Sequence, residues 1–147
     1  DDARRQGKSG VCMLGAEKQK AWLSDQNFAR RFGFETVDAT PDGYELLALS
    51  LDGTKPRFAP SVTQRIDDMG LVVYYDMQCP FIPARVAVLQ KYCAEQGIPA
   101  RFVEVDSLAA AKSLPCVFNN RAVFYGGVFQ TVNQLDPAAL ERILKRK

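Results

Sequence analysis

A single cysteine in the segment DMQCPFIP, Cys79, lies where thiol enzymes place a nucleophile. A strand-like run, VVYYD, precedes it, and a helix-like run, ARVAVLQKYCAEQG, follows it. A cysteine at the start of a helix faces unpaired backbone N–H groups and the positive end of the helix dipole, which lower its pKa. A C-x-x-C redox pair would need a second cysteine where Ile82 stands. The spacing therefore leaves open either a reactive single thiol or a half-buried structural cysteine.

The start of the following helix decides how strongly its dipole acts on Cys79. Pro80 suits the first helical position, where no N–H is needed. If the helix begins there, however, Pro83 falls where the first intrahelical N–H should donate. If the helix begins at Pro83 instead, Cys79 lies in the preceding loop and the dipole lowers its pKa less.

The lack of histidine and the spacing of the cysteines exclude several kinds of catalytic and metal site. The sequence contains no histidine, which excludes Ser-His-Asp and Cys-His catalysis and the zinc sites that use histidine. The spacings of Cys12, Cys79, Cys93 and Cys116 fit neither a zinc ribbon nor a dense disulfide framework, and we expect no metal. Cys12 and Cys93 fall in apolar patterns, so we expect both to pack in the core. Free cysteines fit a cytoplasmic location.

Length and composition narrow the class of protein further. The 147 residues suffice for one ordinary domain or two small ones, and a hydrophobic share of 47% is enough for a buried core. A net charge of +2 does not indicate a nucleic-acid or membrane partner, and no apolar run approaches the roughly 20 residues of a membrane span. The polar start, DDARRQGKSG, has neither an initiator methionine nor a signal peptide. We expect a fragment of a longer protein, or a processed one.

Two folded parts flank a polar segment in the middle of the chain. Residues 52–69 hold two prolines, a glycine and many polar side chains, and we predict a linker between residues 1–51 and 70–147. Periodicity and turn signals in both parts predict a mixed α/β fold of the α+β kind.

In the first part we predict a strand at Val11–Leu14, a helix from about Ser24 to Phe32, and a hairpin. Ser24 can cap the helix and Gly33 can end it. The hairpin strands FETVDA and YELLALSL flank TPDG, whose early proline and late glycine suit a tight turn. Three strands and one helix form a small unit, so we expect its sheet to need further strands that this sequence does not supply.

In the second part we predict the order β-α-β-α-β-β-α. Gly126-Gly127 is a hairpin turn between the last two strands, and Asp136-Pro137 starts the last helix. The first crossover implies parallel neighbouring strands, and the final pair is antiparallel. The predicted elements are strand Leu71–Tyr75, helix Pro83–Gln96, strand Arg101–Val105, helix Ser107–Lys112, strands Ala122–Tyr125 and Val128–Val132, and a helix from Asp136. The predicted inward side chains are Val86, Leu89, Cys93, Leu140, Ile143 and Leu144.

The order of elements predicted for residues 70–147, together with its turn and cap residues, resembles the thioredoxin/glutaredoxin fold. Cys79-Pro80 lies between the first strand and helix, Leu114-Pro115 enters the third strand, and the Gly126-Gly127 hairpin precedes a closing helix. Ile82 replaces the resolving cysteine of a dithiol enzyme, which leaves a monothiol role open.

That resemblance has consequences for the segment Leu114–Cys116. The family keeps a cis-proline facing its active cysteine, at the position of Pro115. Cys116 would then lie near Cys79, and a disulfide between them would need Cα atoms closer than about 7 Å. The edge beside Leu114 and Pro115 could also accept an extended peptide by backbone pairing.

Residues 1–51 are similar to the C-terminal part of GNAT-family N-acetyltransferases. The strand GVCML, a helix ending in RRFGFE, and the following hairpin carry this similarity. The whole chain resembles a more particular group, GNAT proteins with a C-terminal YoaP-like domain. The matching stretches are GKSGVCML, WLSD, YELLALSL, CPFIP and LPCVFNN with AVFY.

This resemblance implies that the parent protein transfers an acetyl group from acetyl-CoA to an amine. We interpret Arg4–Gly10 as the end of the family's long helix and the turn after it, which would put the acetyl-CoA loop upstream of this chain. In the family, an asparagine contacts the cofactor and a tyrosine protonates the leaving thiolate. Trp22 and Ala29 stand at these positions here, so neither role is carried over. Lys18 and Lys20 could meet phosphates or form a solvated turn.

Three functions follow from these resemblances. The first is the C-terminal portion of an acetyltransferase with an accessory domain, inactive and without cofactor by itself, which would need the missing N-terminal half or a homo-oligomer partner. The second is a monothiol redox site at Cys79 with Cys116 as possible partner. The third is a peptide-binding module at Leu114 and Pro115.

Overall fold

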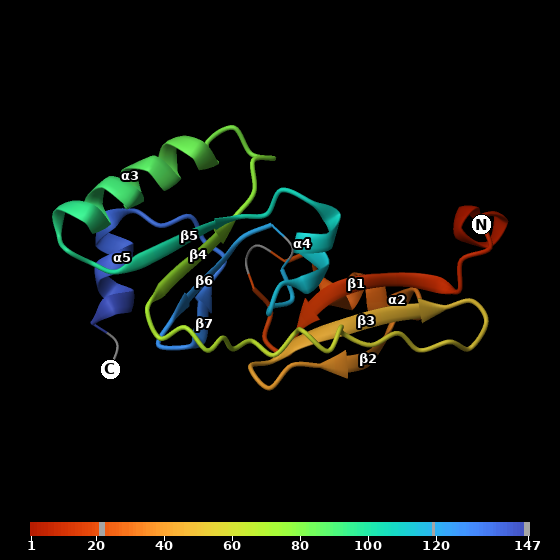
Figure 1. The fold of residues 1–147 in the computed structure, drawn as a ribbon. Coiled ribbons are helices and arrows are strands. Elements are labelled where there is room, and N and C mark those ends of the chain that lie inside the picture. The colour runs from red at the N-terminus through yellow and green to blue at the C-terminus, as the bar shows by residue number, and fades with distance from the viewer. Residues whose placement is uncertain (21–22, 119, 146–147) are drawn as a thin grey trace. The chain divides into compact units, whose positions relative to one another are not determined.

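The computed structural model describes residues 1–20, 23–118 and 120–145. The fold is mixed α/β, as predicted, with two separate sheets (Figure 1). The chain divides into two compact units, Asp1–Pro60 and Ser61–Lys147, which we describe separately. No helix among the described residues is long and apolar enough to cross a membrane.

The first unit contains one antiparallel sheet in the order β1-β3-β2. Its elements are α1 (Asp2–Arg5), β1 (Gly10–Ala16), α2 (Gln26–Arg31), β2 (Glu35–Ala39) and β3 (Tyr44–Ser50). The predicted hairpin is confirmed, because Gly43 takes φ +85° and donates its N–H to the carbonyl of Thr40 at 3.0 Å. The central strand β3 contributes the fully buried Leu47 to the core.

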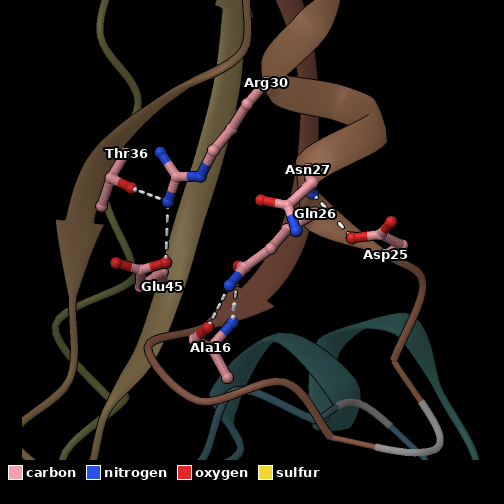
Figure 2. Close-up of polar contacts among 7 residues, drawn as sticks. All are labelled: Ala16, Asp25, Gln26, Asn27, Arg30, Thr36 and Glu45. Carbon is pink, nitrogen blue, oxygen red and sulfur yellow. Dashed lines mark hydrogen bonds and ion pairs between the residues drawn. The ribbon is translucent and has the colours of Figure 1, made fainter.

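The cap of α2 differs from the prediction. Asp25, not Ser24, caps the helix, and its Oδ1 accepts the N–H of Asn27 at 2.9 Å (Figure 2). The helix begins one residue later than a cap at Ser24 requires, and both residue types cap well, so local sequence alone does not separate them. Gly33 ends the helix at φ +86°, as expected.

Side chains of α2 connect it to the sheet at two points. The side-chain amide of Gln26 donates to the carbonyl of Ala16 and accepts its N–H, so it bonds both backbone groups at the end of β1 (Figure 2). Arg30 Nη2 donates to Thr36 Oγ1 at 2.8 Å and to Glu45 Oε2 at 3.0 Å. Gln26 thus connects α2 to β1, and Arg30 connects it to β2 and β3.

The second unit contains a four-stranded sheet in the order β5-β4-β6-β7. Its elements are β4 (Leu71–Tyr75), α3 (Ile82–Glu95), β5 (Ala100–Glu104), α4 (Leu108–Ser113), β6 (Ala122–Tyr125), β7 (Val128–Thr131) and α5 (Pro137–Leu144). Strands β4 and β5 are parallel, whereas the β4–β6 and β6–β7 pairs are antiparallel. The predicted order of elements and both predicted pairings are confirmed.

Turn and cap residues of the second unit act as predicted. Gly126 and Gly127 both have positive φ in the β6–β7 turn. Ser107 caps α4 by accepting the N–H of Ala110, and Asp136 caps α5 by accepting the N–H of Ala139. Pro137 occupies the first helical position of α5, where its missing N–H costs nothing.

The core of the second unit lies between the sheet and two helices, α3 and α5 (Figure 1). The predicted stripe of α3 is confirmed, with all three of its residues buried, and Leu140 and Ile143 of α5 are buried against the same strands. Leu144 is only half-buried and packs at the edge of this cluster. The other buried members of the cluster are Leu71, Val73, Leu89, Cys93, Val123 and Leu135.

The boundary between the units, after Pro60, lies inside the segment predicted as a linker. Residues 61–69 make backbone hydrogen bonds within the second unit. Ile66 donates to Gly127 at 2.9 Å, and Arg65 forms an isolated bridge with Val128 of β7. This part of the polar segment therefore follows the outer edge of the second sheet.

Candidate functional site

Cys79 lies in the turn between β4 and α3. The helix begins at Ile82, between the two starts considered from the sequence, and Pro83 takes its second position. The first four N–H groups of a helix have no intrahelical partner, so Pro83 removes no hydrogen bond there. Cys79 thus precedes the helix by three residues, and its carbonyl accepts the N–H of Ile82 at 3.0 Å.

The thiol of Cys79 is partly exposed, and it has no second cysteine at the C-x-x-C position. Gln134 Nε2, from the loop before α5, lies 4.0 Å from its Sγ, at the outer limit of a hydrogen bond to sulfur. Ile82, at the position of a resolving cysteine, is buried. The geometry supports a solvent-accessible monothiol and provides no second thiol in the adjacent turn of helix.

Cys116 is not paired with Cys79, since all four cysteines are free. Its side chain is buried, and the S–H donates to the carbonyl of Phe118 at 3.2 Å. Burial raises the pKa of the Cys116 thiol to about 11. The group is therefore protonated at neutral pH and unreactive as a nucleophile.

Leu114 and Pro115 lie in an irregular segment before β6, rather than at the entrance of a strand. Every peptide bond in the described part of the chain is trans, including the one before Pro115. The carbonyl of Pro115 accepts the N–H of Gln64 at 2.8 Å, and Gln64 Oε1 accepts the N–H of Val117 at 3.2 Å. The carbonyl of Pro115 is thus paired within the chain.

Nothing in the sequence signals the role of Gln64. It is buried and has φ +57°, a backbone conformation that non-glycine residues seldom adopt. Its position depends on the tertiary contact with the segment around Cys116, which is more than fifty residues away in the sequence.

A pocket of about 550 Å³ opens beside the turn between β4 and α3, at the carboxyl ends of β4 and β5. The residues that line it include three acidic ones, Asp76, Glu104 and Asp106. Asp76 is only 5% exposed, and its Oδ1 accepts the N–H of Gln78 at 3.2 Å. Sequence reasoning did not identify this site, although acidic residues directly after two predicted parallel strands would have been a signal for it.

Arg121, just before β6, is a buried cation. The side chain is 4% exposed, and none of its three guanidinium nitrogens has a hydrogen-bond partner in the part of the chain that the structure describes. Burial lowers the pKa of this guanidinium. No pattern in the sequence distinguishes it from a surface arginine.

In the first unit, Cys12 does not lie in the core. Cys12 is exposed, so our prediction of core packing is wrong for it, whereas it is right for the buried Cys93. Cys12 faces a shallow pocket of about 230 Å³ together with Lys8, Leu49 and Pro56. The apolar pattern of a strand does not say which part of it another element covers. Val11, on the opposite face, is 43% exposed as well, whereas Gly15 and Ala16 are buried, so the N-terminal end of β1 is the part left uncovered.

Of the two residues at the acetyltransferase family positions, Ala29 is among the described residues. Ala29 is buried in α2, and Trp22 lies outside the described residues. Lys18 is exposed, and Lys20 places its Nζ 5.6 Å from the ring centroid of Tyr44. Residues 2–8 form a short helix and a turn at Gly7 before β1, which agrees with our interpretation of this segment as a helix end.

Comparisons with known proteins relate both units to acetyltransferases. The profile of the family described as YoaP-like matches residues 99–142, within the second unit. A Bacillus subtilis (strain 168) protein named "Uncharacterized N-acetyltransferase YoaP" is 27% identical over 146 residues. That alignment covers 97% of this chain and 58% of the relative, so the chain spans less than two thirds of the relative's length. No solved structure matches significantly. The chain is therefore similar to YoaP-like proteins and, distantly, to an N-acetyltransferase.

Proposed function

We propose that this chain is the C-terminal portion of a GNAT-type N-acetyltransferase whose parent protein moves an acetyl group from acetyl-CoA to an amine. The observation that carries the proposal is the similarity to an N-acetyltransferase over 97% of the chain, across both units. In this proposal the first unit completes the catalytic domain, and the acetyl-CoA loop lies upstream of Asp1.

The sheet of the first unit supports this interpretation. Strand β1 pairs with β3 on one side, and no described strand pairs with its other side. A sheet of three strands with one six-residue helix is small for a catalytic domain, and a strand from the N-terminal half could extend it at β1.

The second unit is proposed as an accessory domain of the thioredoxin type. Its strand order, β5-β4-β6-β7, with one parallel pair followed by two antiparallel pairs, supports this reading. The partly exposed Cys79 before α3 supports a second candidate function, a monothiol site in this domain.

Two measurements test the main proposal. Calorimetry of this chain with acetyl-CoA should show no micromolar binding, and such binding would contradict the placement of the cofactor loop upstream. A chimera should join this chain to the part of the Bacillus relative that it does not match. We expect the chimera to release CoA from acetyl-CoA when amines are present, and an inactive chimera that is folded would count against the proposal.

The thiol candidate is tested separately with Cys79→Ser. If the second unit exchanges thiols, this substitution should abolish exchange with a mixed-disulfide probe while acetyl transfer by the chimera persists. A matched Cys12→Ser variant should leave the exchange at Cys79 unchanged.

A further inference from the structure

We propose that the outer edge of β1, with which no described strand pairs, binds a second copy of this chain. The two copies of β1 lie antiparallel, with the two-fold axis of the dimer at Cys12. The inference goes beyond the proposed function, in which the N-terminal half of the parent supplies a strand at the same edge. It therefore applies wherever that half leaves the edge of β1 free.

The backbone groups of β1 point alternately toward β3 and away from it. The carbonyl of Ser9 accepts the N–H of Leu51 at 2.8 Å. Glu17 donates its N–H to the carbonyl of Gly43 at 2.9 Å. Both contacts continue the register of the β1–β3 pair, so the odd-numbered residues of β1 bond toward β3. The backbone groups of the even-numbered residues therefore point to the outer edge.

Contacts within the chain close this outer edge at both ends. At the amino end, the N–H of Lys8 donates to the carbonyl of Ala3 at 2.9 Å. At the carboxyl end, the side chain of Gln26 bonds both backbone groups of Ala16. The outward groups between these ends have no hydrogen-bond partner among the described residues, and they belong to Gly10, Cys12 and Leu14.

An antiparallel second copy satisfies all of these groups in one register. With Cys12 opposite Cys12, Gly10 of each copy faces Leu14 of the other, and each facing pair exchanges two hydrogen bonds. A shift toward the carboxyl end would use Ala16, whose backbone groups are already bonded. A shift toward the amino end would use Lys8, whose N–H is already bonded. The register centred on Cys12 is therefore the one that pairs every free group.

The edge of β1 lacks the features that keep edge strands from pairing with other molecules. Its sequence, GVCMLGA, contains no charged residue and no proline, and its register with β3 is continuous. The opposite edge of the same sheet, β2, has such features, because it carries Glu35 and Asp38 and its register shifts between Thr36 and Asp38. Of the two edges, β1 is thus the one suited to pairing.

Charges at the two ends of β1 favour a second copy as the partner. Lys8 and Glu17 flank the strand, are exposed, and make no ion pair within the described part of the chain. In the antiparallel register, Lys8 lies opposite Ala16 of the second copy and next to its Glu17. Opposite charges therefore meet at both ends of the interface, where they favour this orientation.

Cysteine cross-linking of the 147-residue chain tests the dimer and its register together. In a Cys79→Ser variant, Cys12 is the accessible thiol, since Cys93 and Cys116 are buried. Facing residues of a hydrogen-bonded pair have Cα atoms about 5.5 Å apart, which is within the range of a disulfide. Diamide, which takes up two electrons and two protons from the thiols, should therefore join Cys12 to Cys12 of the second copy. Failure to form this covalent dimer would overturn the inference.

A cysteine shifted by one residue is the matched control. Adding Cys12→Ser and Val11→Cys moves the thiol to another exposed position, which faces Met13 of the second copy. The two new thiols are diagonal neighbours with Cα atoms about 7–8 Å apart. We expect them to cross-link about tenfold more slowly, because that separation exceeds the range of a disulfide. Equal rates at positions 11 and 12 would indicate random collision and contradict the register.

Sedimentation equilibrium measures the association without a covalent bond. Cys12→Ser should leave the dimer in place, because backbone groups form it. Cys12→Pro should give a monomer, since it removes an outward N–H that the fold of one chain does not use. A monomeric wild type, or a Cys12→Pro variant that is folded and still dimeric, would overturn the inference.

Charge reversal provides a second test that does not depend on the folding of Cys12→Pro. Lys8→Glu and Glu17→Lys change exposed residues, and each should weaken the dimer several-fold because like charges then meet. The two substitutions together should restore the affinity of the wild type. Single variants as tightly dimeric as the wild type would contradict the antiparallel arrangement.

The chimera with the Bacillus relative separates this inference from the proposed function. If the chain dimerises and an active chimera does not cross-link at Cys12, both are supported, with the N-terminal half at the edge of β1. If the chimera also cross-links at Cys12, the inference is supported and that placement of the N-terminal strand is wrong. A monomeric chain together with an active chimera would overturn the inference alone.

Discussion

The side chain of Gln64 accepts the backbone N–H of Val117 at 3.2 Å, which joins two segments far apart in the sequence. The same residue donates its own N–H to Pro115 and accepts the N–H of Phe129 through its carbonyl. One glutamine thus holds the segment around Cys116 against the edge of the sheet. The irregular backbone of residues 114–118 is stabilised by this contact rather than by a strand of its own.

Replacing Gln64 should therefore destabilise the second unit. Gln64→Ala leaves the Val117 N–H without its acceptor, and we expect the free energy of unfolding to fall by about 1–3 kcal/mol. Urea denaturation followed by circular dichroism measures this change. Gln96→Ala, at an exposed position just after α3, should change stability by less than about 0.5 kcal/mol. Similar effects of the two substitutions would show that the Gln64 contact is not formed.

The four thiols should divide into two classes of reactivity. Cys12 and Cys79 are accessible and should react with an aromatic disulfide reagent in the native state, whereas Cys93 and Cys116 are buried and should react only after denaturation. The measurement is the number of protein thiols that react with the reagent before and after urea is added. Cys79→Ser should remove one native-state thiol and Cys93→Ser none. A native protein that still shows only two thiols when denatured would contain a disulfide, contrary to the structure.

Stability should decrease at high pH because of Cys116. The pKa of this thiol is raised to about 11 in the folded protein, against about 8.5 in an unfolded chain. The folded state holds the proton more tightly, so this contribution is fully present below about pH 8.5 and is lost as the pH rises toward 11. Between pH 8 and 10.5 we expect wild type to lose about 2 kcal/mol more than Cys116→Ala does.

Denaturation curves at several pH values check this difference. Cys93 keeps its own raised pKa in both proteins, so it cancels in the comparison. Parallel pH profiles for wild type and Cys116→Ala would mean that the thiol of Cys116 is not buried.

The buried guanidinium of Arg121 should destabilise the fold. Arg121→Met replaces three nitrogens that have no partner among the described residues with an apolar chain of similar length, and we expect stability to rise by about 1–4 kcal/mol. Thermal denaturation measures the shift. Arg85→Met, at an exposed position of α3, is the matched control and should stay within about 0.5 kcal/mol of wild type. A loss of stability in Arg121→Met would indicate a bound partner for the cation.

Local turn chemistry made most of the fold predictable. The TPDG turn, the Gly126-Gly127 hairpin and the Asp136-Pro137 helix start each depend on neighbouring residues alone, and the structure has all three. Periodicity likewise identified the buried stripe of α3, since one face of a helix repeats regularly.

Features that depend on distant segments were not predictable in this way. The exposure of Cys12 depends on which end of β1 another element covers, and the acidic pocket depends on the parallel strands β4 and β5 ending side by side, next to Asp76 and Asp106. Ser24 and Asp25 are equally good caps, so only the path of the chain selects between them. Tertiary context decides all of these features.

The paired contact between Gln26 and Ala16 also bears on aggregation. An edge strand presents unpaired backbone groups that can recruit a strand of another molecule. Because the N–H and carbonyl of Ala16 both bond to Gln26, they point away from β3, and by alternation so do those of Leu14 and Cys12. At one end of β1, the Gln26 side chain thus occupies the backbone groups that another strand would need, so no further strand can pair there. No described strand pairs with the remainder of that edge, and we expect this chain alone to self-associate in solution through it.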